Sequence, residues 1–127
     1  MHYGKGEEPD KEGTLKYAAF SLFGQEFGAM DSAHEHHFMF NEAISFIINC
    51  DTQEEIDYYW ERLSAVPEAE QCGWLKDKFG VSWQVVPASM GKMLRGDDRE
   101  RIERVTQTFL VMKKLDIAKI QEAYDKK

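Results

Sequence analysis

The segment CGWLKDKFGVSWQVVP, residues 72–87, decides how the second half of this chain folds. Residues 77–80, DKFG, have the composition of a turn, and residues 81–87 alternate in the way of a β-strand that ends at a proline. The segment therefore predicts two short strands joined by a turn. Alternation places Gln84 on the same side of its strand as Val86, where its amide can line a pocket.

A strand and a helix are expected immediately before this hairpin. AISFIINC, residues 43–50, is rich in isoleucine and phenylalanine, which favour strands. Residues 51–63 begin with a capping-box pattern at Thr52 and then carry apolar side chains at helical spacing. Residues 43–87 are therefore expected to form strand, helix, strand and strand, with a further strand near residues 70–72.

The N-terminal third of the chain predicts another hairpin. Residues 14–32 alternate with apolar side chains on both faces, and Gly24 and Gln25 mark the turn. Because both faces are apolar, we expect both to be covered. Residues 1–13 are dominated by glycine, proline and charged side chains, which is typical of a long loop or mobile arm.

The pattern becomes helical after Pro87. Asp97 or Asp98 is placed to cap one amphipathic helix, and Asp116 is placed to cap another. An amphipathic tail of this kind has to pack on its own sheet or on a partner chain. We therefore expect a domain of residues 1–87, followed by a C-terminal helical extension of residues 88–127.

Composition narrows the class of protein. The net charge of −7 disfavours binding to nucleic acid and to anionic membranes, and no apolar run approaches the length that crosses a bilayer. The polar, acidic N-terminus lacks the apolar stretch of a signal peptide. Cys50 and Cys72 are then expected to be buried thiols and not a disulfide. These features predict a cytoplasmic protein.

Three long segments carry a family resemblance: residues 13–32, residues 40–64 (FNEAISFIINCDTQEEIDYYWERLS) and residues 72–87. Together they resemble the PhnB-like branch of the vicinal oxygen chelate superfamily, which is also labelled demethylubiquinone methyltransferase-like. The tail FLVMKKLDIAKIQEAY, residues 109–124, is similar to that branch as well.

The resemblance implies an α+β fold of the glyoxalase/bleomycin resistance/dioxygenase type. In that fold, paired βαβββ modules enclose a cleft between their curled sheets. This sequence departs from the family pattern because the first module lacks its initial strand and helix, and residues 14–32 supply only the closing hairpin. Either an N-terminal part is missing from the sequence or a second chain fills the gap, and the resemblance implies a homodimer in both cases.

The resemblance also locates the place where relatives hold a metal ion. One ligand position falls near Ala43 and another falls on Gln84; alanine cannot ligate, and a neutral amide is a poor substitute for a carboxylate. We therefore expect no metal, and Gln84 is expected to face the cleft as a hydrogen-bonding group. The HEHH run, residues 34–37, is interpreted either as a solvated loop or as the source of a polar contact from His36 or His37 at the cleft mouth.

Other chemistries are disfavoured by the pattern. The chain has no phosphate-binding loop and no glycine-rich first turn of a doubly wound sheet, so we reject methyl transfer from S-adenosylmethionine and expect no cofactor. Neither cysteine has an evident base partner, and no catalytic residue is assigned. The predicted ligand-binding residues, chosen from the cleft-facing strands and their flanks, are Ser45, Gln84, Trp83, His37 and Asn41.

Three functions are compatible with these features. The first is a protein that binds a small apolar or aromatic molecule in a metal-free cleft. The second is a metal-dependent lyase, isomerase or dioxygenase-type enzyme with a non-standard ligand set that includes Gln84 and a histidine of residues 34–37. The third is a structural or regulatory dimer whose cleft is filled by its own side chains. The metal content of the protein distinguishes the metal-free binding protein from the metal-dependent enzyme. The volume of the cleft distinguishes the structural or regulatory dimer from the binding protein.

Overall fold

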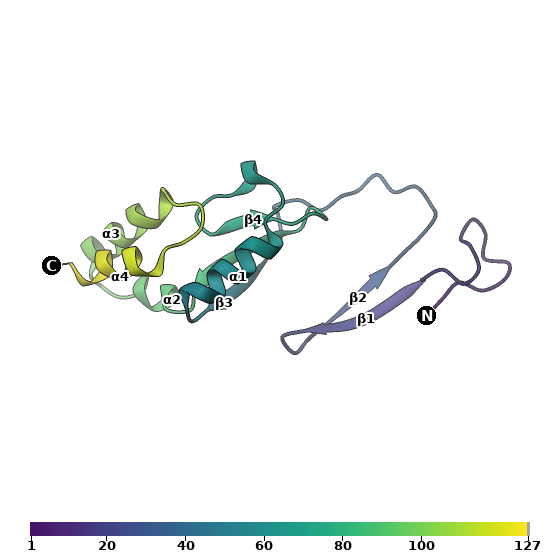
Figure 1. Ribbon diagram of the computed structural model, residues 1–127, viewed down its shortest axis with the longest axis horizontal. Helices are drawn as coiled ribbons and strands as arrows, with labels where there is room; N and C mark the ends of the chain where they lie inside the picture. The colour runs from purple at the N-terminus through teal and green to yellow at the C-terminus, as the bar shows by residue number, and fades with distance from the viewer. Residues whose placement is uncertain (127) are drawn as a thin grey trace. The chain divides into compact units, whose positions relative to one another are not determined.

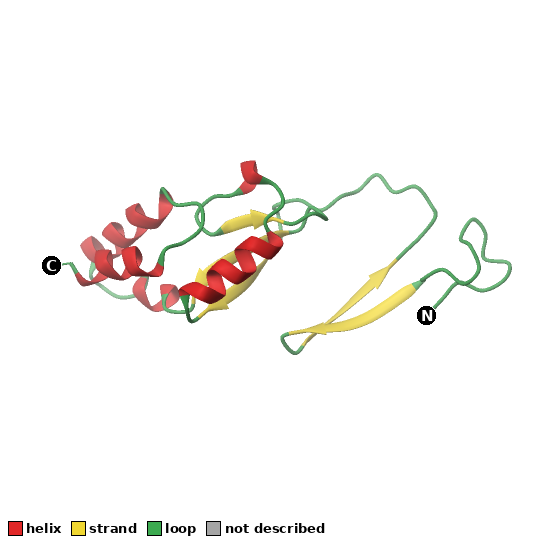
Figure 2. Cartoon of the chain, in the orientation of Figure 1, coloured by secondary structure: helices red, strands yellow, loops and turns green. Residues whose placement is uncertain are grey.

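The computed structural model describes residues 1–126, which fall into two compact units. The N-terminal unit runs from Met1 to Phe38, and the second unit begins at Met39 (Figures 1 and 2). This division differs from the expected boundary between residues 87 and 88, because the helices that follow Pro87 pack into the same unit as the sheet that precedes them.

The N-terminal unit is built on an antiparallel hairpin. Strand β1 (Tyr17–Leu22) pairs with β2 (Gln25–Met30) along its whole length. Phe23 and Gly24 form the two-residue turn, with φ angles of 49° and 79°. Positive φ at both turn positions gives the backbone twist that a two-residue hairpin needs.

The hairpin differs from expectation in its burial. Tyr17, Phe20 and Leu22 are each about two-fifths exposed, so the expected cover on both faces is not supplied by the hairpin's own unit. The first residues instead extend the hairpin: the N-terminal ammonium of Met1 donates to the Tyr17 carbonyl at 3.0 Å, and the Tyr3 hydroxyl donates to the Asp31 carbonyl at 2.6 Å. These contacts join the segment of residues 1–13, which the sequence predicts to be a long loop or a mobile arm, to the hairpin.

The second unit contains a mixed three-stranded sheet. Its order is β3 (Ser45–Cys50), β5 (Ser82–Pro87) and β4 (Trp74–Lys76), with β3 parallel to β5 and β4 antiparallel to it. Helix α1 (Gln53–Leu63) follows β3 directly, as predicted. The Thr52 hydroxyl accepts the Glu55 amide at 3.2 Å and so caps the helix.

The expected fourth strand near residues 70–72 does not form. Pro67–Ala69 is a short 3-10 turn, and Gln71 makes only an isolated bridge to Trp74. Cys72 and Gly73 then adopt φ angles of 51° and 83°, which turn the chain sharply instead of extending it. The observed unit is therefore strand, helix, strand, strand, and not the full βαβββ module.

Helix α1 covers one face of this sheet. Ile48 of β3, Leu75 of β4 and Val85 of β5 all point toward it. Each contributes an apolar side chain that is almost fully buried, which is the main source of stability for an element of this size. The core under α1 consists of Ile48, Cys50, Ile56, Trp60, Leu75 and Val85.

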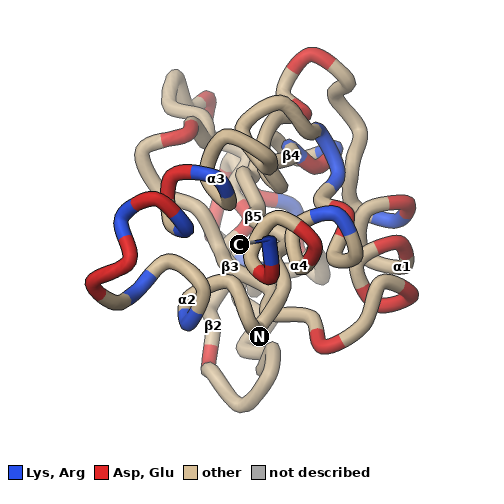
Figure 3. The backbone as a smooth tube through the Cα atoms, turned by 90° about the vertical axis from the view of Figure 1, so that its left-hand side faces the viewer, with Lys and Arg blue, Asp and Glu red and all other residues tan. Residues whose placement is uncertain are grey.

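The C-terminal helices form a second core. They are α2 (Met90–Met93), α3 (Arg99–Leu110) and α4 (Ile117–Asp125). Asp98, one of the two expected candidates, caps α3, and Asp116 caps α4 as predicted. The buried residues of this core are Met93, Val105 and Ile120 of the helices and Leu115 of the segment between α3 and α4, and Val86 of β5 packs against them. The helical tail therefore packs on its own sheet. Figure 3 shows that acidic residues gather along α1, whereas both signs alternate along α3.

Candidate functional site

The face of the sheet opposite α1 carries the side chains that alternate with the core residues. Gln84 and Val86 lie on this face of β5, and Trp74 lies beside Gln84 because the two residues are paired in register. Ser45 and Ile47 belong to the same face on β3, where Ile47 is 58% exposed. This open face of the sheet can form the floor of a ligand-binding site.

Gln84 is fixed in position by a neighbouring strand. Its side-chain Nε2 donates a hydrogen bond to the Ser45 hydroxyl at 2.9 Å. Both residues are half-buried, and the bond joins parallel strands. One of the two Nε2 hydrogens is used in this bond, and within the described residues the Gln84 carbonyl oxygen Oε1 has no bonded donor, so Oε1 is left to accept a hydrogen bond. The structure thus brings together two of the five predicted ligand-binding residues.

A groove of about 660 Å³ lies on this floor. Gln84, Val86 and Trp74 line it from the sheet, whereas Met90, Leu94 and Phe109 line it from the C-terminal helices. The volume falls within the range of small-molecule sites, and the lining has the mostly apolar character of such sites. The strands therefore form the floor of the groove, and the C-terminal helices form its wall.

The rim of the groove is polar. Glu42 lines it and forms an ion pair with Lys76 of β4. The hydrogen bond from Lys76 lowers the pKa of the Glu42 carboxyl, so this group stays ionised near neutrality. Gln71 contributes a second amide to the rim.

The two cysteines have different surroundings. Cys50 is buried beneath α1, and loss of solvent raises the pKa of its thiol to about 11. Cys72 lines the groove, where its Sγ donates to the Leu110 carbonyl at 3.1 Å. Both thiols are free, as expected, although Cys72 is only partly buried.

Trp83 lies on the other face of the sheet from Gln84. Its ring contacts Phe46 with 5.3 Å between centroids, and its Nε1 donates to the Asp77 carboxylate at 2.9 Å. The Asp77 Oδ1 accepts two further hydrogen bonds from the backbone of the turn. Trp83 therefore packs beside the core under α1, and Asp77 holds the β4–β5 turn.

The remaining predicted residues lie outside the groove lining. Asn41 precedes β3, where its Oδ1 accepts the Ala43 amide at 2.9 Å. His37 is exposed and belongs to the N-terminal unit, as do the other residues of the HEHH run. Within residues 1–126, no three His, Cys, Asp or Glu side chains gather closely enough to hold a metal ion.

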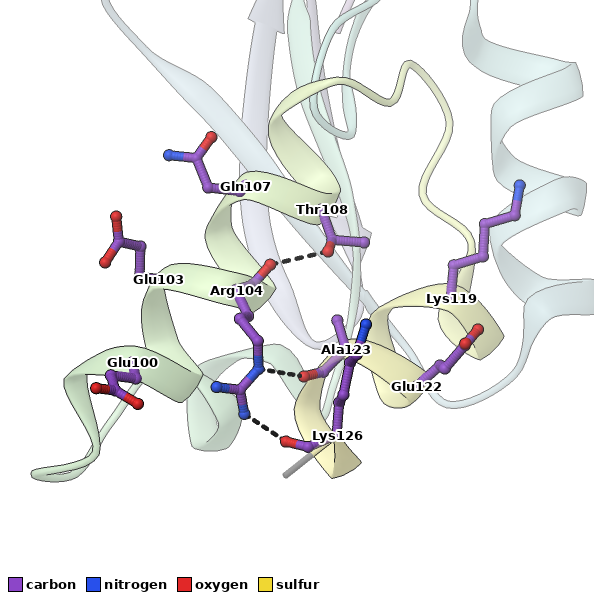
Figure 4. Close-up of a pocket in the computed structure, with 9 residues that line it drawn as sticks. All are labelled: Glu100, Glu103, Arg104, Gln107, Thr108, Lys119, Glu122, Ala123 and Lys126. Atoms are coloured by element: carbon purple, nitrogen blue, oxygen red, sulfur yellow. Dashed lines mark hydrogen bonds between the residues drawn. The ribbon is translucent and has the colours of Figure 1, made fainter.

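Other hollows of the second unit include two that helices line. One lies between α3 and α4, where Arg104 donates to the Ala123 carbonyl at 3.4 Å and to the Lys126 carbonyl (Figure 4). Another lies between the start of α1 and the start of α4. Charged side chains of both signs line each of them. Arg104 is already hydrogen-bonded to backbone carbonyls at the C-terminal end of α4. The sheet groove is the better candidate because its floor is apolar and carries a fixed amide.

Sequence reasoning did not identify part of this groove. Trp74, Met90 and Phe109 line it but were not among the predicted site residues. The pairing of Trp74 with Gln84 could have indicated the first of them, since the predicted hairpin already placed β4 against β5. Nothing in the local pattern of Met90 or Phe109 indicates which face of the sheet the tail covers.

These observations define a class of protein: a small α+β protein with two small sheets, C-terminal helices and a ligand-sized groove on the open face of one sheet. The family model of 3-demethylubiquinone-9 3-methyltransferase matches residues 1–86. The chain therefore belongs to this PhnB-like family, which confirms the resemblance and extends it to the first residue.

One solved structure supports the same assignment. The chain is similar to a PhnB protein from Bacillus cereus that is described as a candidate 3-demethylubiquinone-9 3-methyltransferase, with 39% sequence identity and a TM-score of 0.52. The match covers 68% of this chain and 74% of that chain. A comparison with curated proteins gave no match. Within residues 1–126, no helix is long and apolar enough to cross a membrane.

Proposed function

We propose that this chain binds a small apolar or aromatic molecule in the sheet groove, without a metal ion. The observation that carries the proposal is the groove itself, which combines an apolar floor and wall with one positioned amide. A cleft of this volume can hold a ligand of two or three rings. The proposal favours a binding protein over a dimer whose cleft is filled by its own side chains.

The donor set supports a metal-free site. Gln84 is a neutral amide whose Nε2 donates to Ser45, and the Ala43 side chain has no atom that can ligate a metal ion. Among the described residues that line the groove, Glu42 carries the only carboxylate, and this carboxylate is already paired with Lys76. Divalent ions prefer imidazole and carboxylate ligands, so these residues do not fit a metal centre.

S-adenosylmethionine also does not fit the groove. Its amino-acid carboxylate needs a cationic or N–H-rich partner, and the groove lining within residues 1–126 contains no lysine or arginine. The loop from β3 to α1 reads Asp51–Thr52 and has no glycine that would let the backbone approach a cofactor closely. The proposed function is therefore binding and not methyl transfer.

The proposed assembly is a homodimer of the vicinal oxygen chelate type. The second unit has one strand–helix–strand–strand module, whereas such a cleft is formed by paired modules. The exposed apolar faces of the β1–β2 hairpin and the free edge of β3 are surfaces that a second copy could cover. We further expect the protein to act in the cytoplasm.

Calorimetry with 1-naphthol as the probe tests the binding proposal. A dissociation constant on the order of 0.1 mM is expected for a ligand of this size in a partly open groove. Gln84→Trp places an indole in the groove and should abolish binding, while Gln107→Trp, in the α3–α4 hollow, should leave it unchanged. Binding that survives Gln84→Trp would contradict the proposal.

Elemental analysis and native mass spectrometry of the same sample test the metal-free part of the proposal. A chain free of transition metal, with or without a retained small molecule, is the expected result. One transition-metal ion per chain would overturn the metal-free reading and favour an enzyme.

A further inference from the structure

The sheet groove is polar at one end and apolar at the other. Gln84 and Val86 are two residues apart on β5, which separates them by roughly 7 Å along the strand. The Gln84 end carries the bonded Ser45 and the rim residue Gln71. The Val86 end packs against the C-terminal helices, where Met90, Leu94 and Phe109 gather. A ligand that lies along β5 therefore meets a hydrogen-bonding group first and an apolar wall next.

No unpaired charge within residues 1–126 lines this groove. Glu42 supplies the only carboxylate among the described lining residues, and Lys76 neutralises it. A carboxylate or phosphate would lose its water without gaining a cation, and a ligand cation would compete with Lys76 for the same oxygens. The lining therefore favours a neutral ligand.

The orientation of the Gln84 amide decides which kind of polar ligand group can form a hydrogen bond with it. Its Nε2 is bonded to the Ser45 hydroxyl at 2.9 Å, which turns the carbonyl oxygen Oε1 away from that bond. A carbonyl oxygen accepts hydrogen bonds and cannot donate them. Within the described residues no donor is bonded to this oxygen, so a hydroxyl or N–H of the ligand would satisfy it.

We infer that the groove selects a neutral molecule with a hydroxyl or N–H donor at one end, which Gln84 accepts, and an apolar body that lies against the C-terminal helices. This inference rests on the proposed binding function and specifies its ligand class. Gln84 is then the residue that determines polarity, and Met90 and Phe109 determine how long the apolar body can be. The thioether of Met90 is flexible, so the wall accepts flat and branched bodies alike.

Three naphthyl probes of nearly equal size test the inference: 1-naphthol, 1-methylnaphthalene and 1-naphthoate. Titration of the purified full chain, followed by the fluorescence of each probe, gives the three affinities. Naphthol should bind about 3- to 10-fold more tightly than methylnaphthalene, which is the effect of one neutral hydrogen bond. Naphthoate should bind most weakly of the three.

Gln84→Met replaces the amide with an apolar side chain of similar length. It should lower the affinity for naphthol to that for methylnaphthalene and leave methylnaphthalene unchanged. Gln107→Met, on α3 and outside the groove, is the matched control and should preserve the preference. Circular dichroism and the melting temperature of each variant show whether it has folded.

The possible outcomes distinguish a failure of the ligand class from a failure of the binding function. Equal binding of naphthol and methylnaphthalene to the wild-type chain, or naphthoate binding as tightly as naphthol, would overturn the ligand class and leave the binding function intact. A preference for naphthol that survives Gln84→Met would overturn the role of Gln84. Failure of all three probes to bind would overturn the binding function and this inference together.

Discussion

The side chain of Gln84 donates a hydrogen bond to the Ser45 hydroxyl at 2.9 Å, although the two residues are 39 positions apart in the sequence. The bond crosses from β5 to β3 on the open face of the sheet. It holds the amide in one orientation without occupying its carbonyl oxygen. A side chain positioned in this way can select a ligand without first losing much rotamer freedom.

Ser45→Ala should loosen the Gln84 amide. We expect naphthol affinity to fall by about 3-fold, because the amide must then be ordered by the ligand itself, and stability to fall by less than about 1 kcal/mol. Fluorescence titration and denaturant unfolding measure the two quantities. Ser21→Ala, an exposed serine in the N-terminal hairpin, is the control. An unchanged affinity would show that the bond does not position Gln84.

Asp77→Ala should be strongly destabilising. The buried Asp77 carboxylate accepts the Phe79 amide at 2.8 Å, the Val81 amide at 3.0 Å and the Trp83 Nε1 at 2.9 Å. Its removal leaves three donors without their partner, which should cost about 2–4 kcal/mol of unfolding free energy. Denaturant unfolding followed by tryptophan fluorescence measures the loss. Asp97→Ala, at an exposed position, should change stability by less than about 0.5 kcal/mol, and equal losses in the two variants would contradict this role.

Local patterns predicted the floor of the groove better than its walls. Alternation in residues 81–87 placed Gln84 and Val86 on one face, and both line the groove. The same alternation puts the adjacent Trp83 on the opposite face, where Asp77 binds its indole, although Trp83 was predicted to contact the ligand. The tryptophan that does line the groove is Trp74, because pairing across the hairpin brings it beside Gln84.

The helical walls depend on tertiary packing that no local pattern encodes. Amphipathicity and the caps at Asp98 and Asp116 predicted the two longer helices. Their placement is set by distant contacts: the Cys72 amide donates to the Met112 carbonyl, and Gln53 bonds both the Leu115 carbonyl and the Ile117 amide. Such long-range bonds decide which face of the sheet receives Phe109.

Gly73→Ala should be more destabilising than an ordinary glycine substitution. Gly73 has φ of 83°, and an added Cβ would lie 3.0 Å from both a Leu115 methyl carbon and the Val85 carbonyl oxygen. We expect a loss of about 2–4 kcal/mol, since backbone strain and a steric clash add. Gly96→Ala is the matched control: its φ is 117° but nothing lies within 4 Å, so only strain of about 1 kcal/mol applies. Similar melting temperatures for the two variants would show that the clash is relieved.

A hairpin-dependent dimer is expected in solution. Phe20 on β1 is 44% exposed and stacks on Phe27 with 5.7 Å between ring centroids. Phe20→Glu should shift the chain from dimer to monomer in sedimentation equilibrium, because a charge cannot be buried in an apolar interface without a partner. Val111→Glu, at an exposed apolar position of the second unit, should leave the dimer intact. A monomeric wild-type chain would contradict the proposed assembly.

The two thiols should react very differently. At pH 8, Ellman's reagent should modify one thiol in the folded chain, Cys72, and Cys50 only after unfolding, because burial holds Cys50 as a neutral thiol with a pKa of about 11. An unfolded Cys50 has an ordinary pKa and loses its proton at lower pH than the folded one. The folded state therefore keeps the proton up to a higher pH than the unfolded state. The free energy of unfolding should then fall as the pH rises from the pKa of the unfolded thiol to the pKa of the folded one.

The Cys50→Ala variant isolates this contribution. It should show a shallower fall in unfolding free energy across that alkaline interval than the wild-type chain, whatever its overall stability. Urea unfolding at a series of pH values gives the two slopes. In parallel, saturating naphthol should slow the modification of Cys72, since that thiol lines the groove. Parallel slopes in the two proteins would contradict the raised pKa of Cys50, and modification of Cys72 at an unchanged rate would place the probe outside the groove.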